Sequence, residues 1–311
     1  MIYTSESISV KTSIVAKTKF LIVLAALFLV GSILSFYLLW KPTTFPSSLT
    51  IQNASQVAGI SQEVSSWVSN YQDLTQASTR HQAFRELFAI LQAHNDAAQS
   101  IEKIVLSQQN DNTELLAIAV GVLSSQGTSE AQQSLCNILQ AFNSNDEKAM
   151  VVLPQIMLLE QPQGFLFDEL QAFVHNSSNT LLQENAELVL AGLSQRASQT
   201  NESLAQKITL WLEQKKAQLS GKPEPLAHYL DLLGNTANEA FLDDILPLLT
   251  HKNAEVRVRA VFALRLFRDD QAVIALKHQL SVDQNPQVNR KAAEALSYFY
   301  PTYSDSNNST P

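Results

Sequence analysis

The sequence contains very little of what builds a disulfide-bonded or an all-β protein. Of its 311 residues, one is cysteine, eight are glycine and ten are proline. A single cysteine excludes an intramolecular disulfide, so the folded part must be stabilised by its apolar core. Few glycines and prolines argue against an all-β fold, which needs many tight turns. The one thiol, Cys136 in SLCNIL, follows an apolar helical pattern and is expected to be buried and unreactive.

Motifs of catalysis and of cofactor binding are also missing from the sequence. The stretch GVLSSQG lacks the Lys-Ser/Thr pair of a phosphate-binding loop, and no Gly-x-Ser-x-Gly nucleophile elbow occurs. The six histidines are scattered, with no i, i+4 pair that would suit a metal ion. Adjacent carboxylates, as at 168–169, 243–244 and 269–270, point about 100° apart on a helix and rarely share a proton. The sequence therefore predicts that the protein is not an enzyme and has no catalytic, cofactor-binding or metal-ligating residues.

One long apolar run is present, the charge-free stretch FLIVLAALFLVGSILSFYLLW at 20–40. As a helix its 21 residues span about 30 Å, the thickness of a bilayer core. Three lysines precede the run and one follows it closely, which predicts a cytoplasmic tail at 1–19. We therefore expect a single-pass protein of the inner or plasma membrane, with its folded part extracytoplasmic, or periplasmic in a Gram-negative cell. A cleaved signal peptide is the alternative, although no small-x-small cleavage site follows.

After a linker at 41–55, apolar residues recur at helical spacing as far as about residue 300. An apolar residue closes the second helix of each expected hairpin at intervals of 32 to 40 residues: Leu91, Leu123, Leu159, Leu193, Leu233, Leu266 and Phe299. Such a period is typical of helical repeats. The longest interval, between Leu193 and Leu233, is attributed to an inserted loop in QKKAQLSGKPEP. The pattern predicts an all-α solenoid of about six or seven stacked hairpins over 56–300, and a disordered tail at 301–311.

Residues 239–299 carry two consecutive copies of a more specific pattern. The first copy has a Leu-Pro kink at Pro247, a polar turn, and then Val256, Arg257, Ala260, Ala263 and Leu264 on its second helix. This copy resembles the HEAT repeat family, and the next unit, with Val288, Ala292, Ala293, Ala295 and Leu296, is similar but weaker. The resemblance implies stacked hairpins that bind a protein or peptide. It also implies a polar ladder between repeats, in which Arg257 and Asp283 match the family and Asn289 does not.

Two fainter resemblances leave other functions open. The stretch around ALR at 263–265 is similar to the helical domain of lipovitellin-type lipid carriers, which implies a possible lipid-binding or lipid-carrier function. The repeat itself is also similar to that of HEAT-like lyases acting on bilin pigments. Neither resemblance extends beyond the helical pattern.

Charge is distributed unevenly along the chain. Residues 42–250 carry 9 Lys+Arg and 22 Asp+Glu, whereas 251–311 carry 8 and 6. The acidic body disfavours a nucleic-acid partner. The basic end is either a solvated face or a docking patch for an acidic partner. Its candidate partner-binding residues are Arg257, Arg259, Arg265 and Arg268.

Four aromatic residues at helical spacing have two interpretations. Trp67, Trp211, Tyr298 and Tyr300 are either core residues or anchors of a binding groove. Together with the repeats and the apolar run, they lead us to expect a membrane-anchored HEAT-like scaffold for a protein or peptide partner.

Overall fold

In the computed structural model the described residues are 54–71, 74–94, 96–107, 112–219, 221–267 and 269–299. Within these ranges the regular structure is entirely helical, without a β-strand. The α-helices are α2 (Ala54–Asn70), α3 (Ala77–Ala93), α4 (Ala97–Ser107), α5 (Thr113–Gln126), α6 (Ser129–Ala141), α7 (Asp146–Met157), α8 (Phe165–Asn176), α9 (Thr180–Thr200), α10 (Glu202–Ala217), α11 (Pro223–Thr236), α12 (Leu242–Ile245), α13 (Ala254–Ala263), α14 (Asp270–Val282) and α15 (Pro286–Phe299). Three short 3₁₀ helices are η1 (Glu239–Phe241), η2 (Leu246–Thr250) and η3 (Leu264–Leu266).

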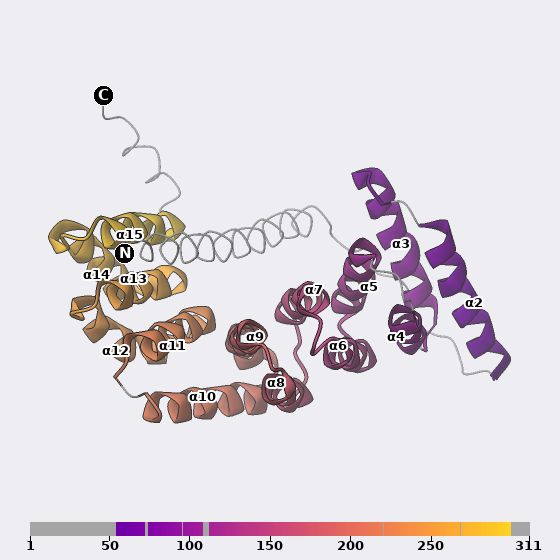
Figure 1. Ribbon diagram of the computed structural model, residues 1–311, viewed down its shortest axis with the longest axis horizontal. Coiled ribbons are helices and arrows are strands. Elements are labelled where there is room, and N and C mark those ends of the chain that lie inside the picture. Colours follow the sequence, from indigo (N-terminus) through magenta and orange to yellow (C-terminus); the bar gives the residue numbers. More distant parts are fainter. Residues whose placement is uncertain are drawn as a thin grey trace, which may run out of the picture. The chain divides into compact units, whose positions relative to one another are not determined.

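Successive helices pair into seven hairpins within the described residues. We call the first helix of each hairpin the A helix and the second the B helix. The A helices are α2, α4, α6, α8, α10, α12 with η2, and α14; the B helices are α3, α5, α7, α9, α11, α13 and α15. Each B helix packs on the B helices of the neighbouring hairpins, in an unbroken series from α3 to α15 (Figure 1). The predicted all-α solenoid of stacked hairpins is confirmed for this part of the chain.

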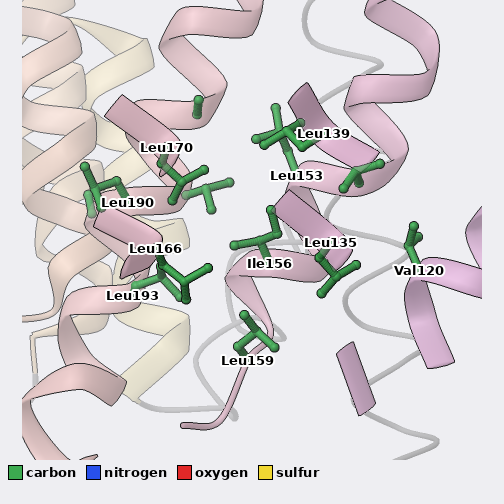
Figure 2. Packing of buried hydrophobic residues seen from close by; sticks show 14 of the residues in the cluster. Val120, Leu135, Leu139, Leu153, Ile156, Leu159, Leu166, Leu170, Leu190 and Leu193 are labelled. Carbon is green, nitrogen blue, oxygen red and sulfur yellow. The ribbon is translucent and has the colours of Figure 1, made fainter. Parts of the chain in front are cut away.

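The residues predicted to close the second helices lie in or directly after B helices in all seven hairpins. Leu91, Leu123, Leu159, Leu193 and Leu233 are at most 1% exposed. Leu266 and Phe299, in the last two hairpins, are less buried. Figure 2 shows how leucines from successive helices fill the space between hairpins, with Leu159 from the end of α7 and Leu193 from α9 among them. Burying such side chains contributes about 1.5–3 kcal/mol each, which is the main stabilisation of a protein without disulfides.

Asparagine marks the start of most B helices. In five of them the side-chain oxygen of an N-cap asparagine accepts a hydrogen bond from a backbone N–H of the first turn: Asn112, Asn145, Asn179, Asn253 and Asn285. These bonds satisfy donors that have no partner inside the helix. Pro286 follows Asn285 at the first helical position, where the missing N–H costs nothing. The polar turns of the sequence therefore set where the second helices begin.

Neighbouring hairpins are also joined by uncharged hydrogen bonds. A long polar side chain of one hairpin donates to a backbone carbonyl of a neighbour, from Gln126 to Leu91, from Gln132 to Gln161, from Gln140 to Glu169 and from Gln279 to Leu249. The N···O distances are 2.9–3.2 Å. Leu91 and Leu249 lie in the last turns of α3 and η2, where a carbonyl has no partner inside the helix, so the amides of Gln126 and Gln279 satisfy groups that burial would otherwise leave unpaired.

The prediction of an inserted loop in QKKAQLSGKPEP is wrong, because most of this stretch is helical. Residues 214–217 belong to α10, and α11 already begins at Pro223. The extra length lies in the helices themselves, since α9 has 21 residues and α10 has 16. Lys215 and Lys216 in the last turn of α10 favour the helix because they complement its C-terminal partial charge. Only a short turn remains, in which Gly221 adopts a positive φ of 70°.

The predicted membrane localisation is corrected. Among the residues that the structure describes, none of the helices combines the length and apolar composition needed to cross a bilayer. The longest, α9, carries Glu184, Glu187 and Arg196. The prediction depended on the apolar run at 20–40, which lies outside the described residues, as do the expected tail segments at 1–19 and 301–311. We therefore do not retain the single-pass, extracytoplasmic placement of the solenoid.

Cys136 is buried in α6, as the sequence predicted, with 1% of its surface exposed. Burial raises the pKa of the thiol, with a smaller contribution from the negative charge of Glu169. Thiolate is the reactive form, so the folded protein should react with a thiol reagent at least about tenfold more slowly than the urea-unfolded chain. Absorbance of released aromatic thiol measures this, with free cysteine as the control. Equal rates for the folded and the unfolded chain would contradict the buried placement.

Candidate partner-binding face

The last three B helices bring charged and aromatic side chains together on one side of the stack. Helices α11 and α13 pack on each other, as do α13 and α15. We call the side chains on this side the C-terminal B face: Asp231 and Asn235 of α11, Arg259 and Phe262 of α13, Arg265 and Leu266 of η3, and Lys291 and Tyr298 of α15. The face thus draws on three consecutive repeats.

Arg259 lies between two carboxylates. Its Nη1 donates to Asp231 Oδ2 across the α11–α13 interface at 2.9 Å, and its Nε donates to Glu255 Oε1 at 2.9 Å within α13. Burial alone would lower the pKa of Arg259, but the two carboxylates raise it. Burial raises the pKa of Asp231, and the charge of Arg259 offsets part of that effect. The guanidinium is therefore fixed in direction, although 42% of its side chain is exposed.

Arg265 has only uncharged hydrogen-bond acceptors. Its Nη1 donates to the carbonyl of Phe262 at 3.0 Å, and its Nη2 donates to Asn235 Oδ1 of α11 at 3.2 Å. The guanidinium also lies 4.1 Å from the centroid of the Phe262 ring, and Lys291 Nζ of α15 lies 4.5 Å from the same centroid. Two cations from neighbouring repeats thus share one aromatic ring, an arrangement that orients both charges.

Two large side chains on this face are open to solvent. Leu266 is 39% exposed and Tyr298 is 52% exposed. The residues equivalent to Leu266 in the first five hairpins are at most 1% exposed: Leu91, Leu123, Leu159, Leu193 and Leu233. Tyrosine and arginine are the residue types that contribute most to protein–protein binding energy. The face therefore combines oriented cations with exposed surface of the kind that binding partners cover.

A second ionic contact lies away from this face, at the turns. Arg257 Nε and Nη2 donate to the two carboxylate oxygens of Asp283 at 2.7 and 3.1 Å, and Arg257 Nη1 donates to the carbonyl of His251 at 2.8 Å. The Asp283 side chain is 3% exposed. Asn289, where the family pattern would place an arginine, donates instead to the backbone carbonyl of Asp283. This is the polar ladder expected from the sequence, formed here by one Arg–Asp pair.

The pattern of residues 215–297 matches the family model described as HEAT repeats. These residues are HEAT repeats. The match covers α11, α13, η3 and α15 up to residue 297, together with the Arg257–Asp283 ladder, and ends one residue before Tyr298. The resemblance inferred from the sequence at 239–299 is thereby confirmed and extended toward the N-terminus.

Comparisons with whole proteins say less about this chain than the match to HEAT repeats does. No curated protein matches the chain. Among solved structures, that of human deoxyhypusine hydroxylase in complex with glycerol is similar over 79% of this chain and 99% of its own, with 14% sequence identity and a TM-score of 0.31. At that score the likeness carries no argument about activity.

The HEAT repeats place the four candidate arginines in different environments. Arg259 and Arg265 lie together on the C-terminal B face. Arg257 lies at the turn, where its guanidinium is bound to the carboxylate of Asp283. Arg268 lies outside the described residues. Sequence analysis missed Asp231, Asn235 and Lys291, because their contacts with α13 come from other repeats and depend on how the helices align.

The four candidate aromatic anchors also lie in different environments. Trp67 and Trp211 are core residues, and Trp67 Nε1 donates to the carbonyl of Ala83 at 2.8 Å. Tyr298 is exposed on the C-terminal B face, whereas Tyr300 lies outside the described residues. The core interpretation therefore holds for the two tryptophans and not for Tyr298, whose role as an anchor stays a prediction.

Two cavities within the described residues bear on the lipid-binding alternative. An apolar cavity among α2, α3, α4 and α5, lined by Trp67, Ile101 and Leu115, has a volume of about 40 Å³. A cavity of this size can hold water but is too small for an acyl chain. A wider recess between α2 and α3 is open and lined mainly by polar residues such as Glu63 and Glu86. Nor does any group of three His, Cys, Asp or Glu side chains within the described ranges have the arrangement of a metal site.

Proposed function

We propose that the chain is a HEAT-repeat scaffold that binds a protein or peptide partner through the C-terminal B face. The observation that carries the proposal is the exposure of Tyr298, which lies near Arg265, and of Leu266, which follows Arg265 in η3. Stacked helical repeats present extended surfaces, and they bind partners more often than they catalyse reactions. An aromatic anchor with ordered arginines beside it is the usual centre of such an interface.

The order of the face before binding also supports this function. Each guanidinium is already held by neighbouring repeats, so a partner would not have to fix these side chains itself. Immobilising a long side chain on binding costs about 0.5–1.5 kcal/mol, which an ordered face avoids. Burial lowers the pKa of Arg265, while the charges of Asp231 and Glu294 offset part of that effect, so a partner carboxylate would meet a guanidinium that is already oriented.

Site-specific photo-crosslinking in the full-length chain tests this function. A photoreactive residue at Leu266 should give a discrete crosslinked product in cells, and Tyr298→Ala should reduce that product at least about tenfold. The matched control variant is Ile274→Ala, since Ile274 is 66% exposed on the A helix of the same hairpin. A photoreactive residue at Leu210 of α10, which is 57% exposed, controls for unspecific capture. Equal products from positions 266 and 210, or no effect of Tyr298→Ala, would contradict the proposal.

A further inference from the structure

Helix α10 packs differently from the A helices before it. Helices α4 and α6 each pack extensively on the preceding A helix. In contrast, α10 packs along α9, the B helix of the preceding hairpin, and few of its residues approach α8 or its own B helix α11. Its buried apolar residues are Leu204, Ile208, Trp211 and Leu212. Apolar packing therefore holds α10 on α9 and contributes little toward the A helices on either side.

Lysines provide the contacts that apolar packing does not. Helix α10 contains three lysines, and each is paired with a carboxylate of a different helix. Lys207 Nζ lies 3.1 Å from Asp168 Oδ2 of α8. Lys215 Nζ lies 2.5 Å from Glu187 Oε1 of α9. Lys216 Nζ lies 2.5 Å from Asp244 Oδ1 of α12.

The three pairs differ in their access to solvent. Lys207 and Asp168 are 45% and 69% exposed, and Lys216 and Asp244 are 53% and 19% exposed. Ion pairs as open as these are weak and are screened by salt. The pair with Glu187 is more buried, because that carboxylate is 11% exposed and is also bound by His228 Nε2 at 2.8 Å. The contacts toward α8 and α12 are therefore the ones most sensitive to charge.

Other groups around these lysines do not replace the ion pairs. Lys215 lies 5.4 Å from the centroid of the Trp211 ring on its own helix, and Lys207 lies 5.6 Å from that of Phe167 on α8. Tyr229 OH donates to Asp244 Oδ2 at 3.4 Å, but this bond joins α11 to α12 and leaves α10 out. The pair Lys216–Asp244 bridges α10 and α12.

We propose that α10 is an electrostatic joint in the stack, a regulatory device that goes beyond partner binding. When the lysine charges are screened or removed, α10 separates from α8 and α12 while it stays packed on α9. The B helices, whose contacts are apolar and continuous from α9 to α13, remain in place. Ionic strength, or any modification that neutralises these lysines, thus controls whether the A helices on the two sides of α10 are connected.

Hydrogen exchange of the unmodified full-length chain tests the joint without a mutation. Raising the salt from about 50 mM to about 1 M shortens the screening length to about 3 Å. Amides of α10 should then exchange roughly three- to tenfold faster, because local opening becomes easier. Helix α6 is the internal control, since Gln140 holds it to α8 through an uncharged amide. Exchange in α10 that does not respond to salt, or that changes no more than in α6, would overturn the proposal.

Variants distinguish the lysine pairs from a general effect of salt. The triple variant Lys207→Gln, Lys215→Gln, Lys216→Gln should exchange in α10 at low salt as fast as the unmodified chain does at high salt. Lys103→Gln, on the exposed side of α4, is the matched control and should leave α10 unchanged. Exchanging the charges of one pair, Lys216→Asp with Asp244→Lys, should restore slow exchange relative to Lys216→Asp alone. Failure of this restoration, or normal exchange in the triple variant, would show that the pairs do not hold α10.

Discussion

Replacing Gly234 by alanine should destabilise the protein by about 1–3 kcal/mol. A Cβ atom at this position in α11 would lie 2.7 Å from Ala263 Cα and 3.3 Å from Ala263 O of α13. These are backbone atoms, so the clash cannot be relieved by rotating a side chain, and the two B helices must move apart. The gain in helix propensity, about 1 kcal/mol, offsets only part of this cost. Chemical unfolding followed by circular dichroism measures the change.

Gly121→Ala is the matched control, since Gly121 also lies within a B helix. Its added Cβ would meet Phe84 Cε2 at 3.6 Å and Gln155 Oε1 at 3.8 Å, which are ordinary contacts. This variant should keep its stability or gain up to about 1 kcal/mol from helix propensity. Equal losses in the two variants would mean that close approach of α11 and α13 is not what requires glycine.

Removing the carboxylate of Asp283 should cost about 3 kcal/mol or more of stability. Asp283→Ala leaves the Arg257 guanidinium, whose side chain is 19% exposed, without its charged partner. It also removes the acceptor for Gln279 Nε2 and for the backbone N–H of Asn285, so three groups lose a bond together. Asp168→Ala is the control, because its pair with Lys207 is exposed and should be worth no more than about 1 kcal/mol. Similar losses for Asp283→Ala and Asp168→Ala would contradict the structural role of the ladder.

The same pair predicts how stability changes in acid. Hydrogen bonds from Arg257 hold the pKa of Asp283 below its ordinary value, and those from Asn285 N–H and Gln279 contribute further. The unfolded chain therefore binds a proton at a higher pH than the folded chain. The contribution of Asp283 is complete above its unfolded pKa of about 3.9 and is lost as the pH falls through the lower folded pKa. Asp283→Asn should flatten this acid limb in unfolding experiments, whereas an unchanged slope would exclude Asp283 as its source.

Much of the fold follows from the sequence because the repeats are local. The apolar positions from Leu91 to Phe299 identify the B helices correctly, since each hairpin must bury one side against the next. The Arg257–Asp283 ladder was implied by the resemblance to HEAT repeats, and the structure contains it. Helix α10 was misjudged at its end, where a lysine pair beside glycine and proline reads as a loop. The two lysines of its last turn pair with Glu187 and Asp244 of other helices, which no local pattern shows.

The candidate face was only partly predictable for the same reason. Arg259 and Arg265 stand out as part of a basic segment, but their surroundings come from α11 and α15. The exposure of these side chains could not be predicted either, since Trp211 and Tyr298 are both aromatic residues on helices and the local sequence does not distinguish them. Only the stacking of the last hairpins shows that Tyr298 remains open while Trp211 is covered.

The unbroken series of B helices has a mechanical consequence. Each hairpin contacts chiefly its neighbours. A pulling force along the stack therefore passes through one B–B interface after another. Such a chain extends first at its most compliant link. Around α10 the A helices add little resistance, so the interface of α9 with α11 carries the load almost alone there. Under tension the protein should therefore lengthen near α10 before the hairpins on either side lose their helices.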